Sequence, residues 1–170
     1  EKFCKYIVML NPRIIPCLLI KNKGLVKTVR FNDPKYVGDP LNAVKIFNEK
    51  EVDELIVLDI DATVENREPD YKMIENMAVE CRMPLCYGGG IKTVEQAQKV
   101  FNLGVEKIAI SSAVIENPNI VSDIAKRVGS QSVVIVLDVK KKLIGDKYEI
   151  FVNNAQKNTG KCPVEFAKQM

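Results

Sequence analysis

One acidic side chain ends a long apolar segment of this sequence. The segment SVVIVLDVK, from Ser132 to Lys140, joins β-branched and aliphatic residues to a carboxylate at Asp138. Such a run predicts a strand that is buried on both faces, as strands of parallel sheets are. Ligands bind at the carboxyl ends of parallel strands, so Asp138 is a candidate acid or base. An Asp that only caps a turn is the alternative.

A second segment near the start of the chain repeats this pattern without the acid. RIIPCLLIK, from Arg13 to Lys21, is again an apolar run that is followed by a lysine. Aligning the two segments places Leu19 opposite Asp138 and indicates a weak internal repeat. We therefore expect Leu19 and Asp138 to face each other across one pocket, with a carboxylate on only one side.

Glycines and hydroxyls follow two further predicted strands. One short apolar run breaks into three glycines that end at Gly90, and the next, which starts at residue 106, ends in Ser111 and Ser112. Glycine lets the backbone approach a ligand closely, and the helix expected at 93–103 points its amide end toward the glycine turn. Hydroxyl groups suit phosphate oxygens. Gly90, Ser111 and Ser112 are therefore interpreted as half of a phosphate cradle, and an empty turn is the alternative.

A hairpin is predicted to stand over the end of the first strand. Residues 22–31 begin with a turn and continue with alternating apolar and polar residues, among them Lys27. Loops in this position can close on a ligand, and Lys27 would then lie beside it. An exposed lysine without such a role is the alternative.

Charged residues stand at the opposite ends of the predicted strands. Arg13, Glu54 and Lys107 each come at the start of a strand. If their side chains share the inner face of a barrel, they form a charged ring at its floor and must pair there. Ordinary surface charges are the alternative. Glu54 and Asp59 have opposite parity, so both can point inward only if their strand contains a bulge.

The order of elements predicts an α/β fold. Strands are expected at about residues 13, 54, 84, 106 and 132, and helices at 40–50, 71–81, 93–103 and 114–128, the last of which is entered at Asn117 and Pro118. A second hairpin arm is expected at 148–152, a polar loop at 153–160 and a further helix from Pro163. Alternating strands and helices indicate βαβ units and a parallel sheet. A doubly wound sheet and a (β/α) barrel both fit. The barrel is favoured because the candidate ligand groups follow several different strands.

Composition limits the classes of function. The 170 residues suffice for one domain, interpreted as residues 13–170 after an N-terminal extension at 1–12. A net charge of +3 without a basic, aromatic-rich stretch argues against nucleic acid as a partner. No apolar run reaches the roughly 18 residues of a membrane span. Five cysteines without a CxxC pair favour reduced thiols in the cytoplasm.

Histidine is absent from the sequence. That excludes a nucleophile activated by histidine and a metal site built on histidine, and we expect neither a metal nor a cofactor. Acid–base chemistry then falls to Asp, Glu, Lys or Cys side chains.

Four motifs together resemble one protein family. They are RIIPCL at 13–18, VDELIVLDI at 52–60, YGGGI at 87–91 and the strand that carries Asp138. Across about residues 11–168 the chain closely resembles HisF, the cyclase subunit of imidazole glycerol phosphate synthase. The resemblance implies a (β/α)8 TIM barrel, of which this chain covers about the first five βα units. About three more units would complete such a barrel, so the remainder is either missing here or absent from a truncated chain, whose apolar strand edges would promote self-association.

The resemblance also implies roles for the candidate residues. In that family a HisH-like glutaminase releases ammonia beneath the barrel, and the ammonia passes through the lumen to a bis-phosphorylated ribulosyl intermediate. Asp138 would be one of two catalytic aspartates, and Lys27 would belong to the mobile first loop. Gly90, Ser111 and Ser112 would bind a phosphate of this phosphorylated small molecule. Arg13, Glu54 and Lys107 match three members of the charged gate at the ammonia entrance.

Two positions depart from the pattern of HisF. Leu19 replaces the second catalytic aspartate, and Ser111 replaces a residue that is usually Asn. The segment IIPCLLIKNKGLVKT is instead similar to HisF-like proteins of lipopolysaccharide and other surface-sugar pathways, which act beside a glutaminase and a sugar amidotransferase. We therefore expect ammonia delivery for the amidation of an acetamido sugar. The alternatives are a genuine cyclase of histidine biosynthesis, with Asp59 as the replacement acid and a possible substrate contact, and a scaffold that only activates its glutaminase.

Overall fold

A computed structural model describes residues 11–29, 32–142 and 146–170 of the chain. Its strands form a seven-stranded sheet of order β3-β2-β1-β4-β5-β6-β7 and a three-stranded sheet of order β10-β9-β8. The strands are β1 Cys17–Lys21, β2 Gly24–Val29, β3 Asn32–Gly38, β4 Leu55–Asp59, β5 Leu85–Gly88, β6 Lys107–Ile110, β7 Val133–Ile135, β8 Asp138–Lys141, β9 Tyr148–Val152 and β10 Lys157–Asn158. The helices are α1 Pro40–Glu49, α2 Tyr71–Glu80, α3 Val94–Phe101, α4 Ser112–Glu116, α5 Asn119–Val128 and α6 Pro163–Gln169.

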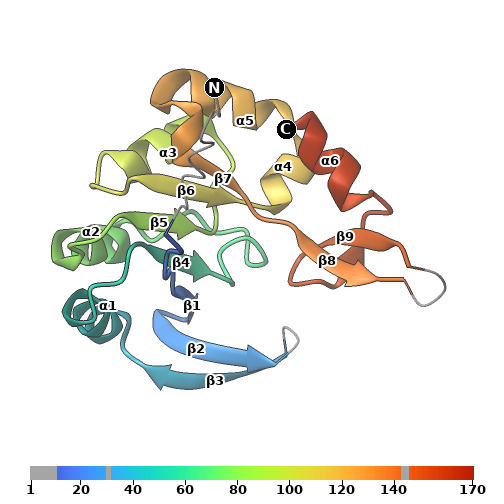
Figure 1. Ribbon diagram of the computed structural model, residues 1–170. Coiled ribbons are helices and arrows are strands. Elements are labelled where there is room, and N and C mark those ends of the chain that lie inside the picture. The colour runs from blue at the N-terminus through green and yellow to red at the C-terminus, as the bar shows by residue number, and fades with distance from the viewer. Residues whose placement is uncertain (1–10, 30–31, 143–145) are drawn as a thin grey trace, which may run out of the picture.

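The central part of the larger sheet is parallel. β1 pairs with β4, β4 with β5, β5 with β6 and β6 with β7, all in parallel, and helices connect β4, β5, β6 and β7. Figure 1 shows α1, α2, α3 and α5 on the outer side of the curved sheet. The predicted α/β class is thus confirmed, and the curved parallel sheet is consistent with part of a HisF-type barrel. Among the described residues β3 and β7 are the edges of this sheet.

Alternation along the strands separates two faces. In β4, Leu55 and Val57 are fully buried against the helices, whereas Ile56 and Leu58 are only partly buried on the inner face. Opposite the sheet, the helices contribute buried apolar residues that include Ile74, Met77, Val100 and Ile124. This two-layer core fixes the strand ends, and with them the side chains on the inner face.

Local signals set the helix starts. The carboxylate of Asp39 accepts a hydrogen bond from the amide of Asn42 at 3.0 Å, and Pro40 occupies the first turn of α1, as predicted. At α3, Thr93 and Gln96 form a reciprocal capping box. None of the helices among the described residues has the length and apolar character that a membrane span requires.

Four expectations about element boundaries are wrong. The first strand begins at Cys17 rather than Arg13, directly after Pro16, which has no amide hydrogen to donate. The helix expected at 114–128 is two helices, because a residue before proline avoids the helical conformation. The second of them, α5, starts directly after Asn117 and Pro118, where the sequence predicted the entry. The polar loop at 153–160 contains the short strand β10.

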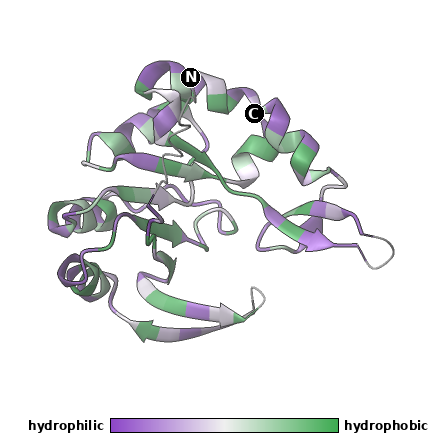
Figure 2. Cartoon of the chain, in the orientation of Figure 1, coloured by the Kyte–Doolittle hydropathy of each residue, from purple (hydrophilic) through white to green (hydrophobic). Residues whose placement is uncertain are grey.

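The fourth difference concerns the segment that carries Asp138. The expected strand 132–140 breaks after β7, and Asp138 instead begins β8, where it pairs with Phe151 of β9. Figure 2 shows the reason, because the chain changes from hydrophobic in β7 to hydrophilic in β8. The interpretation of residues 1–12 as an extension falls almost entirely outside the described residues.

We expect the buried layer between α2 and the sheet to dominate stability. Ile74→Ala removes a fully buried side chain and should lower the free energy of unfolding by about 2–5 kcal/mol. Val79→Ala, on the same helix at a side chain that is 84% exposed, should change it by less than about 0.5 kcal/mol. Urea unfolding of both variants tests this, and equal effects would contradict the placement of α2.

Candidate functional site

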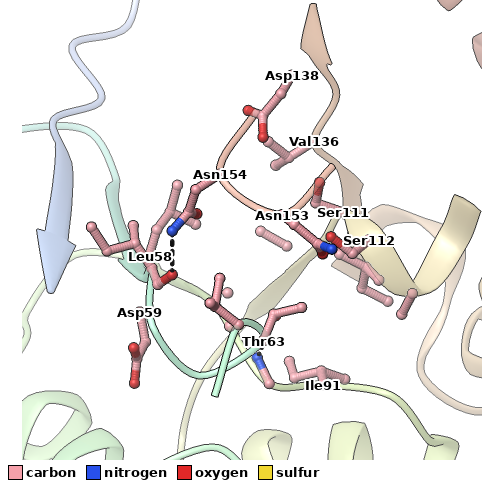
Figure 3. A pocket seen from close by; sticks show the side chains of 18 of the residues that line it. Leu58, Asp59, Thr63, Ile91, Ser111, Ser112, Val136, Asp138, Asn153 and Asn154 are labelled. Carbon is pink, nitrogen blue, oxygen red and sulfur yellow. Dashed lines mark hydrogen bonds between the residues drawn. The ribbon is translucent and has the colours of Figure 1, made fainter. Parts of the chain in front are cut away.

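A cavity of about 670 Å³ lies at the carboxyl ends of the parallel strands. Its wall combines the ends of β1, β4, β5 and β6 with the start of β8 and the turn after β9. Figure 3 shows labelled side chains from the ends of β4 and β6, the start of β8 and the turn after β9 around one space. Groups that are distant in the sequence therefore meet at the position where parallel sheets bind ligands.

Leu19 and Asp138 both line this cavity. Leu19 is in β1 and pairs with Leu58 of β4, which lines the cavity too. Asp138 is more than half removed from water, and this burial raises the pKa of its carboxyl, with Lys140 opposing the shift. The internal repeat predicted that Leu19 and Asp138 share a pocket, and both residues line this cavity, to which Asp59 and Glu116 also contribute carboxylates.

The glycine turn after β5 forms another part of the wall. A Cβ at Gly89 would lie 2.5 Å from the carbonyl oxygen of Asp59, and a Cβ at Gly90 would lie 2.8 Å from that of Arg67. Both glycines have positive φ, of 123° and 73°. Side chains are therefore excluded on steric and conformational grounds. The amide of Gly90 donates a long hydrogen bond of 3.4 Å to Thr63.

Ser111 and Ser112 lie at the end of β6 and line the cavity with Gly90. The structure thus brings together the three residues of the predicted phosphate cradle. The start of α3, which was expected to assist them, uses at least two of its amides in its own cap. The amides of Lys92 and Thr93 both donate to the side chain of Gln96, so the start of α3 is capped by its own residues.

The structure places Lys27 outside the cavity wall. It is an exposed residue of β2 and pairs with Lys35 of β3, whereas its neighbour Thr28 lines the cavity. Among the described residues, no three His, Cys, Asp or Glu side chains gather closely enough to hold a metal ion.

Asp59 borders the cavity, but its carboxylate is engaged in the loop after β4. One oxygen accepts hydrogen bonds from the amides of Asp61 and Ala62, each at 3.1 Å, and the other lies 3.6 Å from the guanidinium of Arg67. Figure 3 shows this carboxylate pointing away from Asp138 and the two serines. Its opposite parity to Glu54 is the reason, because β4 contains no bulge.

Arg13, Glu54 and Lys107 meet at the other end of the strands. The ammonium of Lys107 lies 2.6 and 2.7 Å from the two carboxylate oxygens of Glu54, and the guanidinium of Arg13 lies 3.4 Å from one of them. The side chain of Glu54 is only 6% exposed, so it requires such partners. The predicted pairing of these charges is found.

The sequence did not indicate Asn153 and Asn154 as site residues, yet both line the cavity. They were assigned to a polar loop, and the only available signal was the occurrence of two adjacent asparagines after a predicted strand. Their position depends on the docking of the small sheet, in which Asn154 donates to the carbonyl of Ile60 at 3.2 Å.

Comparison with known proteins identifies the family of this chain. Residues 13–170 match the family described as "Histidine biosynthesis protein". The chain belongs to this family.

Three members of the family show how the similarity is distributed. Over 162 residues the chain is 61% identical to the "Putative imidazole glycerol phosphate synthase subunit hisF3" of Vibrio vulnificus, covering 95% of this chain and 62% of the relative. The corresponding "Putative imidazole glycerol phosphate synthase subunit HisF" of Leptospira borgpetersenii is 55% identical over 162 residues, with 95% and 64% covered. The "Imidazole glycerol phosphate synthase subunit HisF" of Natranaerobius thermophilus is 38% identical over 162 residues, again with 95% and 64% covered. The chain therefore spans less than two thirds of the length of these HisF proteins.

The raised pKa of Asp138 predicts a pH dependence of stability. A carboxyl with a higher pKa in the folded state contributes stability that is present below the unfolded pKa and lost as the pH rises through the folded pKa. The variant Asp138→Asn has no carboxyl to ionise at this position, so it does not lose this stability as the pH rises. We expect the free energy of unfolding of the variant, relative to the unsubstituted protein, to increase as the pH rises above about 4, the ordinary pKa of an aspartate, until the folded carboxyl has ionised.

Urea unfolding at several pH values measures this difference. Asp123→Asn is the matched control, because the side chain of Asp123 is half exposed. A difference for Asp138→Asn that stays constant or falls with pH would contradict the buried position of its carboxyl.

Proposed function

We propose that this HisF-like chain acts in a glutamine amidotransferase complex, as a subunit that conducts ammonia from a HisH-like glutaminase to the cavity. The cluster of Arg13, Glu54 and Lys107 would form the entrance, at the end of the strands opposite the cavity. The arrangement suits this role, because a buried carboxylate shared by two cations can exchange partners while a small neutral molecule passes. The HisF names of the relatives support the family-level part of this proposal.

The wall between the entrance and the cavity supports passage of ammonia as a neutral molecule. Ile56 and Leu58 share the parity of Glu54, and Cys86 and Gly88 pair with them on β5. Burial, together with the nearby Glu54 carboxylate, raises the pKa of Cys86 to about 12, so its thiol stays uncharged. An apolar wall without charged groups favours ammonia over ammonium, because burial of a charge is costly.

The observation that carries the proposal is Leu19 in the cavity wall with Asp138. The pattern of HisF that the chain resembles has a carboxylate at both positions. Removal of one positioned acid or base typically lowers a rate by about 10² to 10⁴, or roughly 3–5 kcal/mol of barrier. A subunit that retains the entrance and the phosphate-binding groups but lacks one acid would still bind a phosphorylated small molecule and deliver ammonia, with little cyclase activity.

The acceptor of the ammonia is proposed to be an acetamido sugar of lipopolysaccharide or another surface polysaccharide. A separate sugar amidotransferase would use the delivered ammonia. The similarity of residues 14–28 to HisF-like proteins of such pathways supports this choice. The higher identity to the hisF3 protein of Vibrio vulnificus, 61% against 38% for the HisF of Natranaerobius thermophilus, supports a branch of the family that is separate from that HisF.

The second candidate function is a cyclase of histidine biosynthesis. It needs a second acid, for which the sequence suggested Asp59, and Glu116 is the other carboxylate that lines the cavity. The hydrogen bonds that Asp59 makes to Asp61 and Ala62 weigh against this alternative, because they would have to break before its carboxylate could turn into the cavity.

Restoring the missing acid tests the proposal. We expect the unsubstituted protein to convert the bis-phosphorylated ribulosyl intermediate to imidazole glycerol phosphate slowly with free ammonium, and Leu19→Asp to raise this rate at least about tenfold. Leu19→Asn is the control, because asparagine has nearly the shape of aspartate but its amide cannot act as an acid or base. Turnover by the unsubstituted protein equal to that of Leu19→Asp would favour the cyclase alternative.

A substitution at the entrance distinguishes a subunit that conducts ammonia from a scaffold that only activates its glutaminase. In the complex with a HisH-like glutaminase, Lys107→Met should reduce glutamine-dependent amidation about tenfold, while amidation with free ammonium stays unchanged. Lys72→Met is the control, since Lys72 forms an exposed pair with Glu75. Unchanged glutamine-dependent transfer in Lys107→Met would instead support a scaffold that only activates its partner.

A further inference from the structure

The turn after β9 has an unusual backbone. Asn153, Asn154 and Ala155 are consecutive residues with positive φ, of 55°, 53° and 59°. Residues with a Cβ avoid this conformation, which asparagine tolerates better than most. Strained backbone of this kind occurs most often at ligand sites and persists only where the surroundings hold it.

Two hydrogen bonds hold the turn in place. The side-chain amide of Asn154 donates to the carbonyl of Ile60 at 3.2 Å and so joins the small sheet to the end of β4. The ammonium of Lys140 donates to the carbonyl of Ala155 at 2.8 Å, from β8 of the same sheet. The side chain of Ala155 is buried. The turn is thus fixed from both sides.

This fixed turn directs the side chain of Asn153 into the cavity. Asn153 lines the cavity wall, and Figure 3 shows it beside Ser111 and Ser112, whereas Asn154 points to the opposite side. In the described part of the chain, the side-chain amide of Asn153 makes no hydrogen bond. It is an amide donor held next to two hydroxyls in an open cavity.

We infer that Asn153 is a ligand-binding residue, whose amide donates to the phosphoryl group that Ser111 and Ser112 bind. This inference rests on the proposed phosphate-binding role of the two serines. Neutral donors from two different elements would surround one anionic group, and the backbone strain of the turn would serve to place the third donor. The small sheet would thereby take part in ligand recognition, in addition to carrying Asp138.

Substitutions that keep the backbone conformation test the inference without a change of fold. Asn153→Gly removes the amide and retains positive φ, because glycine adopts it freely. Asn153→Asp keeps the shape and the tolerance of positive φ but places a carboxylate next to the phosphate. Ala155→Gly is the matched control in the same turn.

Calorimetric titration with ribose 5-phosphate, and with ribose as the control without phosphate, gives the readout. We expect Asn153→Gly to weaken binding of ribose 5-phosphate about tenfold, since hydrogen bonds to charged groups are the stronger class. Asn153→Asp should weaken it further, through repulsion between like charges. Ala155→Gly should bind within about twofold of the unsubstituted protein. A purely structural role for Asn153 would leave Asn153→Asp close to the unsubstituted protein.

The outcomes distinguish this inference from the proposed function. If Ser111→Ala with Ser112→Ala weakens binding while both Asn153 variants bind normally, the inference is wrong and the phosphate site stands. If the unsubstituted protein does not prefer ribose 5-phosphate to ribose, or if the double serine variant binds normally, the phosphate site is wrong and the inference falls with it.

Discussion

The close contact between the glycine turn after β5 and the loop after β4 determines the shape of the cavity. Gly88, Gly89 and Gly90 approach Leu58, Asp59 and Arg67 so closely that a Cβ at any of the three would lie within 3.0 Å of another atom. The carboxylate of Asp59 stabilises the facing loop from within, through the amides of Asp61 and Ala62. These two fixed segments form one side of the cavity. The hydroxyls after β6 and the small sheet line the rest of it. The carboxylate of Asp59 is also kept out of the cavity by the same contact.

The chemistry of the cavity follows from the replacement of one of the two acids of the HisF pattern by Leu19. Asp138 lies in a partly desolvated position, which raises the pKa of its carboxyl, and Leu19 presents an apolar surface on the wall of the same cavity. An acid at Asp138 without a partner acid at position 19, together with the hydroxyl and amide donors of the wall, suits the binding of a phosphorylated molecule better than proton transfer by two paired acids. The charged cluster at the far end of the strands takes no part in this chemistry. Its proposed role in ammonia delivery depends on the proposed passage between the cluster and the cavity.

Sequence patterns predicted those features that depend on strand periodicity and local caps. The parity of β4 separated Glu54 from Asp59, and the order of Asp39 and Pro40 marked the start of α1. The break between β7 and β8 was not predicted, because the apolar run of SVVIVLDVK continues past the end of β7 to Leu137, and the break depends on pairing between Asp138 and Phe151. Asn153 and Asn154 were missed for a related reason. A polar turn carries no signal of the tertiary contact that brings it to the cavity.

The most direct test of the central claim is a structure of the protein with a bis-phosphorylated ribulosyl ligand in the cavity. We expect Asp138 to be the one carboxylate within about 2.6–3.2 Å of the reacting atoms, with Leu19 in van der Waals contact on the other side. A second carboxylate at that distance, above all Asp59 rotated out of its loop, would contradict the account and restore the two-acid chemistry of a cyclase.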